Sequence, residues 1–405
     1  MISVSALSHP PLRVCMLAPS HPAWDPRVVQ REARSLAKMG HRVSVVAMHD
    51  GRRPFPSELE LLPLPPRGPN RWKRALLIWR VYRMALRWRA DVYHVHEVES
   101  LVVGVLLKWR TGAKLVFDAH ECFQFTAARF LSGWKARLVT RITACFLHFL
   151  ARRADHVIVV SFTNELFYRE DCGCTRVDII YNSPPLEMFP FEPKPPEAAW
   201  TLTHDGFLGR SRGQQQILHA LAIVRKETRV QFLVVGELQE ADREEFDRSV
   251  AELGLHDIVE VTGWIPFEQV GPALNRGSIG LIAMQPTPNN YKSLSNKLFN
   301  YMATGQAVIG PSGSDTEEVI RRANCGLAAD MTKPESLADA LLSLLRHPQR
   351  TRELGLNGRR AIEAEFGWHR MEDLLQRIYG RLAGVRIPEG IRGYGEPPGP
   401  VTSTT

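Results

Sequence analysis

Two arginines stand at a predicted turn between a strand and a helix, where a phosphate group can bind. The segment Gly209-Arg210-Ser211-Arg212-Gly213 follows an apolar run that ends at Leu208 and precedes an amphipathic stretch. Guanidinium groups offer bidentate donors, and a helix N-terminus adds free amides and the positive end of the helix dipole. This pattern suits a diphosphate, although two solvated surface arginines would give the same sequence.

A second anion site is predicted at the start of a helix over 296–303. Ser295 is a favourable N-cap residue, and Lys297, Asn300 and Tyr301 fall on one face of that helix. The free amides at the helix start and the lysine could hold an anion. An ordinary buried helix is the alternative, because its apolar residues would pack well.

A histidine closes a predicted strand in the segment Asp118-Ala-His120-Glu121. At the carboxyl end of a parallel strand, His120 is well placed to polarise or position a substrate hydroxyl. Asp118 and Glu121 could orient this histidine or bind an acceptor. His96 and Glu97 end a neighbouring strand, where a purely structural role for His96 is the alternative.

Short apolar runs alternate with amphipathic stretches along most of the chain, which predicts parallel sheets covered by helices on both faces. The expected strands of a first domain cover 13–18, 41–48, 92–96, 114–117 and 156–160, with a helix over 26–39. Those of a second cover 202–208, 230–235, 258–261, 279–284 and 307–309, with helices over 214–226, 241–253, 296–303 and 334–345. The predicted fold class is α/β, with two Rossmann-like doubly wound domains facing each other across a cleft that would hold the ligands.

The expected domain organisation follows from this rhythm and from two proline-rich stretches. We predict a first domain over 1–184 and a second over 199–366. A stiff linker rich in proline is expected over 185–198, and a disordered tail over 388–405.

The composition excludes several classes of protein. The 405 residues are 44% hydrophobic and 23% charged, which is ordinary for a globular protein and unlike a disordered or disulfide-scaffold chain. Six cysteines are spread thinly along the chain, with Cys172 and Cys174 as the only close pair, and this favours reduced thiols in the cytoplasm. No signal peptide and no apolar run of spanning length is visible, so we expect any membrane contact to be peripheral. The net charge of +8 predicts an anionic partner, and nucleic acid is disfavoured because no nucleic-acid motif accompanies the charge.

The segment 72–89 combines aromatic and basic residues at helical spacing. Lys73, Arg80, Arg83 and Arg87 fall on one stripe beside an apolar one. Such a helix can rest on the anionic inner face of a membrane and reach a lipid-linked acceptor. It can equally pack by its apolar stripe and expose its basic one to solvent.

The string Ser-Asn-Lys-Leu-Phe-Asn-Tyr-Met-Ala-Thr-Gly-Gln-Ala-Val-Ile, at 295–309, resembles the nucleotide-sugar segment of glycosyltransferase family 4. Further similar segments occur in the family's order along nearly the whole chain. They include Asp25-Pro-Arg-Val28, the strand ends at 91–96 and 116–121, Ile180-Tyr-Asn-Ser183 and Phe366-Gly-Trp-His-Arg370. The resemblance implies the two-domain B-type fold (GT-B), with a terminal helix over 367–387 that returns to the first domain.

The resemblance also implies roles for particular residues. Arg210, Arg212 and Lys297 would take the places of basic groups that bind the donor diphosphate. The donor would further meet Gly236, Trp264, Ile265, Ser295, the amides of Asn296 and Leu298, and Asn300. His120 would contact the donor sugar. Asp25, Arg27, His96, Asp118 and Glu121 would lie on the acceptor side. Asp25 and Arg27 stand where many relatives have a glycine pair, so we expect this loop to contact the acceptor instead of cradling phosphate.

The chain departs from the family at two acidic positions. The family commonly carries two glutamates eight residues apart, and Lys292 and Asn300 stand there instead. Asn300 can still accept a ribose hydroxyl through its amide oxygen, with a weaker bond than a carboxylate makes. Donor binding would then depend more on the phosphates.

These observations predict a retaining, metal-independent glycosyltransferase that needs no cofactor. A UDP- or GDP-linked sugar would be the donor, and a glycan, a lipid-linked molecule or a small molecule the acceptor, as in glycan biosynthesis. The alternative is a non-catalytic relative that serves as a binding or partner subunit. A sugar-nucleotide epimerase of the same architecture is a third possibility, and it would turn over donor without acceptor.

Overall fold

The computed structural model describes residues 10–51, 54–65, 71–126, 131–193 and 200–385, apart from the side chains of 71–75 and 124. The chain divides into unit 1, which is Met1–Ile180 with Met371–Thr405, and unit 2, which is Tyr181–Arg370. The predicted tail over 388–405 lies outside the described residues, as does the linker from 194 to 198.

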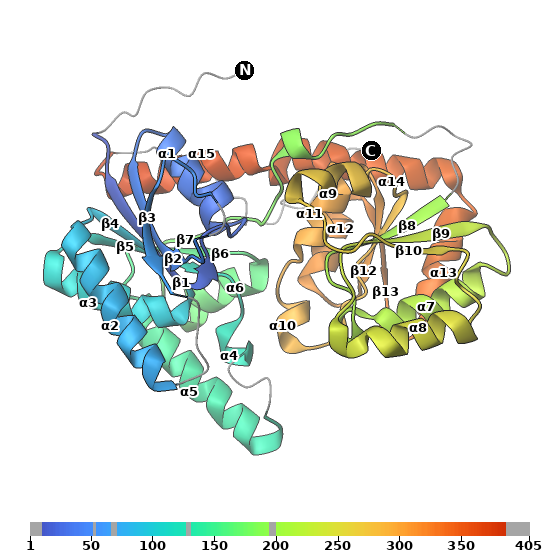
Figure 1. The fold of residues 1–405 in the computed structure, drawn as a ribbon, viewed down its shortest axis with the longest axis horizontal. Coiled ribbons are helices and arrows are strands. Elements are labelled where there is room, and N and C mark those ends of the chain that lie inside the picture. The colour runs from blue at the N-terminus through green and yellow to red at the C-terminus, as the bar shows by residue number, and fades with distance from the viewer. Residues whose placement is uncertain (1–9, 52–53, 66–70, 127–130, 194–199, 386–405) are drawn as a thin grey trace, which may run out of the picture. The chain divides into compact units, whose positions relative to one another are not determined.

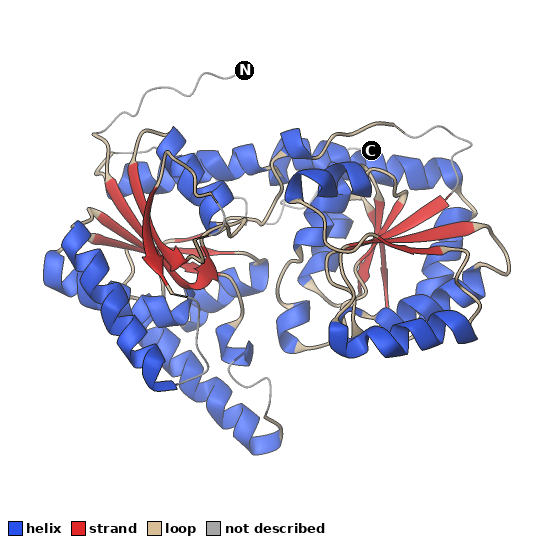
Figure 2. Ribbon diagram, in the orientation of Figure 1, coloured by secondary structure: helices blue, strands red, loops and turns tan. Residues whose placement is uncertain are grey.

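Unit 1 is built on a seven-stranded sheet in the order β3-β2-β1-β4-β5-β6-β7, and each neighbouring pair runs parallel (Figures 1 and 2). Its strands are β1 (Arg13–Pro22), β2 (Arg42–Met48), β3 (Glu60–Leu64), β4 (Val92–His96), β5 (Lys114–Ala119), β6 (His156–Val159) and β7 (Val177–Ile179). Helices pack on both faces of the sheet, as the buried apolar runs of β1, β2 and β4 require.

Unit 2 is built on a six-stranded parallel sheet in the order β10-β9-β8-β11-β12-β13. Its strands are β8 (Trp200–Asp205), β9 (Val230–Val235), β10 (Val259–Val261), β11 (Ile279–Leu281), β12 (Ala307–Pro311) and β13 (Gly326–Ala329). This is the doubly wound order, with a reversal between β8 and β11.

The helices of the described residues connect these strands. In unit 1 they are α1 (Arg34–Lys38), α2 (Arg71–Trp88), α3 (Glu97–Thr111), α4 (Phe123–Thr126), α5 (Gly133–Ala151) and α6 (Phe162–Leu166). In unit 2 they are α7 (Gln214–Val224), α8 (Arg243–Glu252), α9 (Phe267–Leu274), α10 (Pro288–Tyr291), α11 (Asn296–Ala303), α12 (Asp315–Ala323), α13 (Pro334–Leu345) and α14 (Pro348–Ala361). The last helix, α15 (Trp368–Leu382), belongs to unit 1 from Met371 onward. None of the described helices is both long and apolar enough to cross a bilayer.

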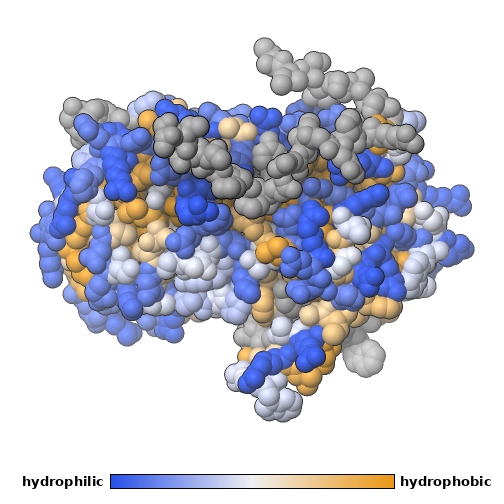
Figure 3. Space-filling view, turned by 180° about the vertical axis from the view of Figure 1, so that it is seen from behind, coloured by the Kyte–Doolittle hydropathy of each residue, from blue (hydrophilic) through white to orange (hydrophobic). Residues whose placement is uncertain are grey.

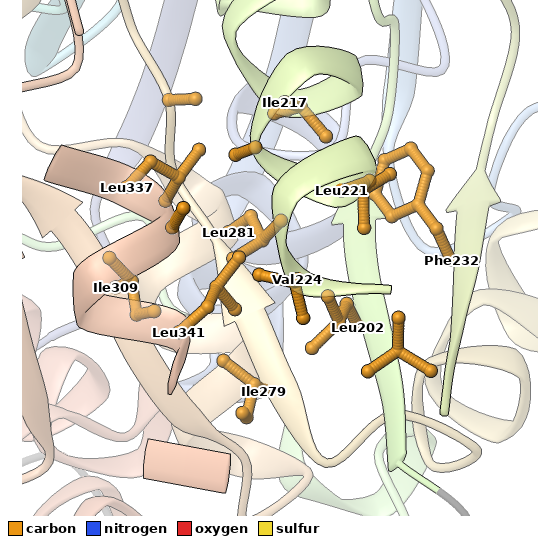
Figure 4. Close-up of a cluster of buried hydrophobic side chains, with 14 of the residues drawn as sticks. Leu202, Ile217, Leu221, Val224, Phe232, Ile279, Leu281, Ile309, Leu337 and Leu341 are labelled. Carbon is orange, nitrogen blue, oxygen red and sulfur yellow. The ribbon is translucent and has the colours of Figure 1, made fainter. Parts of the chain in front are cut away.

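The core of unit 2 lies between its sheet and helices α7 and α13. Leu221 and Leu341, from these helices, meet Leu202, Phe232 and Leu281 from three strands, and all five are essentially inaccessible to solvent (Figure 4). The buried area fixes the helices on the sheet and thereby the loops at its carboxyl edge.

Several elements differ from the sequence prediction. The strand predicted over 13–18 continues to Pro22, and the helix predicted over 26–39 begins as a π-helical segment at Val28–Ala33 before α1. The strand predicted to reach Leu208 ends at Asp205. Residues 186–188 of the predicted linker form a short 3₁₀ turn, and Phe189 is buried in unit 2, 6.1 Å from the ring of Phe267.

Candidate active site

The carboxyl ends of the strands beside each reversal carry the polar side chains that the sequence singled out. In a doubly wound sheet, ligands bind at this position because the loops diverge there. In unit 2 it is the edge near Asp205, at the end of β8, and in unit 1 it is the edge formed by the ends of β1, β4 and β5.

Three polar side chains of α11 converge on the end of β8. Lys297 donates a hydrogen bond to the main-chain carbonyl of Asp205, and Asn300 Nδ2 donates to Asp205 Oδ2 at 2.8 Å. The hydroxyl of Tyr301 accepts from the Asp205 amide at 2.9 Å. These are the three residues predicted to share one helix face, and that face holds Asp205 in place.

Positive charge outweighs negative charge around this strand end. Burial lowers the pKa of Lys297 to about 8, more than the nearby Asp205 carboxylate raises it, and the charge of Arg212 lowers it further. Arg212 Nη1 donates to the Phe207 carbonyl at 2.9 Å, and burial lowers the pKa of this guanidinium as well. A bound anion would offset this repulsion, so the edge is electrostatically suited to phosphate.

Two glycines bring the ends of β8 and β9 close together. Gly236 has a φ of +145°, and a Cβ there would lie only 2.5 Å from the Gly206 carbonyl oxygen. A side chain at 236 would therefore strain the backbone and push the two strand ends apart. The absence of a Cβ fits the predicted role of Gly236 beside the donor, which stays a prediction.

Arg210 and Arg212 point to different partners. Arg210 donates to a carboxylate oxygen of Glu245, lies 3.5 Å from Asp242 Oδ1, and has a side chain that is 67% exposed. To bind a phosphate beside Lys297, Arg210 would have to leave both carboxylates.

The remaining donor-side predictions concern the start of α11 and the loop after β10. Ser295 occupies the N-cap position of α11 without a side-chain capping bond. The Leu298 amide, expected to be free, donates to the Ser295 carbonyl at 3.1 Å, so that part of the predicted anion cradle is engaged within the helix start. Asn296 is exposed, Ile265 is half-buried, and Trp264 is 64% exposed.

In unit 1, Arg27 and Asp118 form a buried bidentate pair. Arg27 Nε and Nη2 each donate to an oxygen of Asp118 at 3.0 Å, and Nη1 donates to the Ile180 carbonyl at 2.9 Å. Burial would raise the pKa of Asp118, but the charges of Arg27 and His120 outweigh this effect and hold the pKa well below its usual range. The pair joins the loop after β1 to the end of β5.

His120 lies beside side chains from the end of β4, from β5 and from the start of α3. Its Nε2 lies 3.1 Å from His96 Nδ1 and 3.4 Å from Asp118 Oδ2, and its Nδ1 lies 3.7 Å from Glu97 Oε1. His96 is fully buried, and burial lowers its pKa to about 4 in spite of Asp118. A neutral His96 and an ionised Asp118 therefore orient the ring of His120, while Glu121 accepts a hydrogen bond from Thr126 at 2.9 Å.

His21 also lies at this edge, although no motif in the sequence marks it. Its Nδ1 lies 3.0 Å from Asp25 Oδ2 and its Nε2 lies 3.4 Å from Glu97 Oε1. Burial lowers the pKa of His21, but the hydrogen bonds to both carboxylates outweigh it and raise the pKa to about 9. The other oxygen of Asp25 accepts from the amides of Arg27 and Val28, each at 2.9 Å, and thus starts the following helix.

Among the residues of unit 1 that the structure describes, two groups of histidines and carboxylates have ligand atoms close enough for a metal ion. They are Glu32 with His94, His96 and Asp118, and His21 with Glu97 and His120. In the first group, Arg27 Nε already lies 3.0 Å from oxygens of both Glu32 and Asp118. In the second, His21 is itself a cation between carboxylates. Arg27 and His21 therefore already supply positive charge at these two groups.

Comparisons with known proteins match both halves of the chain to glycosyltransferase domains. A sequence model of the glycosyl transferase 4-like domain matches residues 26–183, and one of the group 1 glycosyl transferases matches residues 202–347. The MMP α-(1→4)-mannosyltransferase of Mycolicibacterium hassiacum is 27% identical over 169 residues, which are 42% of this chain and 39% of that protein. The chain thus matches less than half the length of this relative.

Solved structures share the fold over nearly the whole chain. The sucrose-phosphate synthase of Thermosynechococcus elongatus has a TM-score of 0.73 at 18% identity, covering 92% of this chain and 99% of its own. The HepE protein of Anabaena in complex with UDP has a TM-score of 0.68 at 15% identity, covering 91% and 100%.

The chain is a glycosyltransferase of the GT-B type. It has two Rossmann-like domains with parallel sheets and a cationic strand end in the second, and both of its halves match glycosyltransferase domain models. More particularly, the chain belongs to the family 4-like glycosyltransferases, whose two domain models it matches in order.

Proposed function

We propose that this transferase moves a sugar from a UDP- or GDP-linked donor to a hydroxyl group of an acceptor, with retention at the anomeric carbon. The observation that supports this most is the pair of cations Lys297 and Arg212 at the carboxyl end of β8. The carboxylate of Asp205 partly balances their charge. A protein of similar fold has been crystallised with UDP, which supports a uridine nucleotide.

The donor diphosphate is assigned to unit 2. Lys297 and Arg212 would neutralise its charge, and the exposed start of α11 would add amides. The proposal needs neither a metal ion nor a cofactor, because these two cations serve the role that a divalent ion would otherwise have. Arg210 contributes less, since Glu245 and Asp242 already engage it.

Asn300 is assigned to the ribose. Its Nδ2 donates to Asp205, so its Oδ1 is the group left to accept a hydroxyl. Asp205 is thus a positioning residue that fixes the direction of the amide. Position 300 has an amide where the family has a carboxylate. The carboxylate of Asp205, at the end of β8, orients this amide.

The reaction is assigned to the departing diphosphate and to groups that position the substrates. The bond between the anomeric carbon and the phosphate oxygen breaks, and the acceptor oxygen bonds to the same face of that carbon. The acceptor proton passes to the leaving phosphate oxygen. Arg212 and Lys297 stabilise the charge that develops on the leaving group, and His120 holds a hydroxyl of the donor sugar.

The acceptor is assigned to unit 1, and a glycan, a lipid-linked molecule or a small molecule fits the proposal. A chain that acts in the cytoplasm at the inner face of a membrane would reach a lipid-linked acceptor. Helix α2, within the basic segment 72–89, packs by the buried residues Val81, Ala85 and Trp88, and Arg80, Arg83 and Arg87 remain exposed. The side chain of Lys73 lies outside the described residues.

Titration calorimetry with UDP, GDP, ADP and TDP tests the donor site, with Arg212→Ala against Arg210→Ala as a matched pair. Selective binding of UDP or GDP that only Arg212→Ala abolishes supports the proposal, and sugar release in EDTA together with an acceptor screen then tests transfer. Binding of none of the four by the folded protein would favour the non-catalytic partner subunit, because Lys292 and Asn300 replace the two usual glutamates.

A further inference from the structure

Helix α5 presents a long apolar stripe to solvent. Leu131, just before the helix, and Trp134, Leu138, Ile142 and Phe149 recur at intervals of three, four and seven residues, and each is between 42% and 67% exposed. This spacing places them on one face of the helix. We call these five residues the α5 stripe. Most of the buried contact of α5 with the rest of unit 1 comes from the other side of its carboxyl-terminal half, through residues such as Leu147 and Leu150.

The charge around the stripe has a single sign. Between Glu121 and Asp155 the sequence contains six Lys or Arg residues and no Asp or Glu. Three of the six, Lys135, Arg137 and Arg141, are exposed on α5 beside the stripe. The stretch 61–90, which includes α2, likewise has eight Lys or Arg residues and no acidic one. The net positive charge of the chain is therefore concentrated on these two segments of unit 1.

The stripe continues onto the neighbouring helix α3. The guanidinium of Arg153 lies 3.6 Å from the ring centroid of Phe149 and 5.7 Å from that of Trp109, and Trp109 is 63% exposed. In Figure 3, apolar and strongly polar residues lie side by side on the projection at the bottom of the view, where α5 extends from unit 1 in Figure 1. Together these features form one apolar and basic surface.

We propose that the α5 stripe is a membrane-docking surface that inserts into an anionic bilayer. A helix with apolar and aromatic residues on one face and cations alongside lies in the plane of the headgroups, with its apolar face at the acyl boundary. Exposed tryptophans such as Trp134 and Trp109 suit that depth, and each cation near the surface adds attraction to acidic lipids. A second copy of the chain fits less well, because the same cations would face each other.

This inference stands on the surface alone and not on the donor site, but it deepens the proposed function. A transferase held on a bilayer by α5 meets lipid-linked acceptors in preference to soluble ones. It also extends the membrane contact considered for α2, whose carboxyl-terminal half is packed against unit 1. Vesicle binding and diphosphate binding are separate measurements, so the failure of one is distinguishable from the failure of the other.

The chain supplies its own reporter for this test. Cys145 on α5 is exposed, whereas the other five cysteines are buried. A polarity-sensitive fluorophore on Cys145 of the full chain is mixed with phosphatidylcholine vesicles that contain either no phosphatidylglycerol or roughly 30% of it. We expect a blue shift and flotation with the anionic vesicles only, both reduced by high salt. The same fluorophore on Leu166→Cys, in a Cys145→Ser background, is the matched control, because Leu166 is an exposed apolar residue of α6.

Substitutions on the exposed stripe complete the test without touching the core. The double variant Leu138→Glu with Ile142→Glu is expected to lose about tenfold or more of its vesicle affinity, with unchanged circular dichroism and UDP affinity. Leu166→Glu is expected to bind as the parent does. Equal vesicle binding by the parent and the double variant would overturn the proposal. So would a parent dimer in light scattering that the double variant dissociates, since a second copy would then cover the stripe.

Discussion

The buried pair of Asn300 and Asp205 can be tested by exchanging its two groups. Asn300→Asp keeps the shape of the side chain but leaves two carboxylates whose facing atoms were 2.8 Å apart. Two unit charges at that distance repel by about 6 kcal/mol at an effective dielectric constant of about 20. Protonating one carboxyl at pH 7 costs about 4 kcal/mol and limits the penalty. Because Lys297 attracts the added charge, we expect the free energy of unfolding to fall by about 2–4 kcal/mol.

The exchanged protein, Asp205→Asn with Asn300→Asp, has one amide and one carboxylate again. We expect it to regain most of the lost stability, with an interaction energy of about 2 kcal/mol or more in the double-mutant cycle. The pH dependence has a definite sign. In the single variant, repulsion raises the pKa of one carboxyl above its unfolded value of about 4. The penalty is therefore absent below about pH 3, where that carboxyl is protonated in both states, and grows as the pH rises.

Urea unfolding of the full chain, monitored by circular dichroism at pH 5 and pH 8, measures the loss of stability and its pH dependence. The transition to compare is the one in which unit 2 unfolds. Gln349→Glu, which changes an exposed amide of α14 into a carboxylate, is the matched control and is expected to change stability by less than about 0.5 kcal/mol. Parent-like stability of Asn300→Asp at pH 8 would refute the proposed pairing. An exchanged protein no more stable than the single variant would do the same.

Three further predictions follow from the two strand edges. Diphosphate affinity should fall as the pH rises through about 8, by up to about tenfold per pH unit, because Lys297 with its lowered pKa loses its charge there; calorimetry from pH 7 to 9.5 measures this, and Lys297→Met should flatten the profile. His21 should stabilise the fold by about 2–3 kcal/mol below its unfolded pKa near 6.5, and that contribution should be lost as the pH rises through its raised pKa of about 9; unfolding of His21→Gln at pH 6 and pH 10 should show a large and a small deficit respectively. Gly236→Ala should cost about 1–3 kcal/mol and weaken UDP binding, because its φ of +145° and the nearby Gly206 carbonyl leave no place for a Cβ; equal UDP affinity and melting temperature would contradict this.

The sequence predicted the central strands better than those at the sheet edges. The strands over 92–96 and 230–235 and the helices over 296–303 and 334–345 have the predicted bounds. The missed strands β3, β7 and β13 all lie at the edge of a sheet. Edge strands are short and half-covered, and β3 contains Pro63 while β13 contains Gly326, so they lack the continuous apolar run that marks a central strand.

The site was predictable where it depends on helical periodicity and not where it depends on tertiary pairing. The shared face of Lys297, Asn300 and Tyr301 follows from their spacing alone. Their common partner, Asp205, lies at the end of strand β8, about ninety residues earlier in the chain, and no pattern in the sequence near Asp205 marks it. The turn of Arg210 toward Glu245 is likewise decided by the position of α8.

Charge balance explains why the anionic donor is assigned to unit 2 and the acceptor to unit 1. At the β8 edge, Arg212 and Lys297 face one carboxylate, that of Asp205, and burial lowers the pKa of both cations, so an anion relieves an existing repulsion. At the unit 1 edge the cations are already matched. His21 lies between Asp25 and Glu97, and Arg27 pairs with Asp118, while burial and the charge of Asp118 raise the pKa of the neighbouring Glu32 well above its usual range. A diphosphate would meet those carboxylates as a like charge, whereas an acceptor hydroxyl can donate to them. On the proposed function, the phosphate site and the hydroxyl site would thus differ in the number of ionised carboxylates beside the cations of each sheet edge.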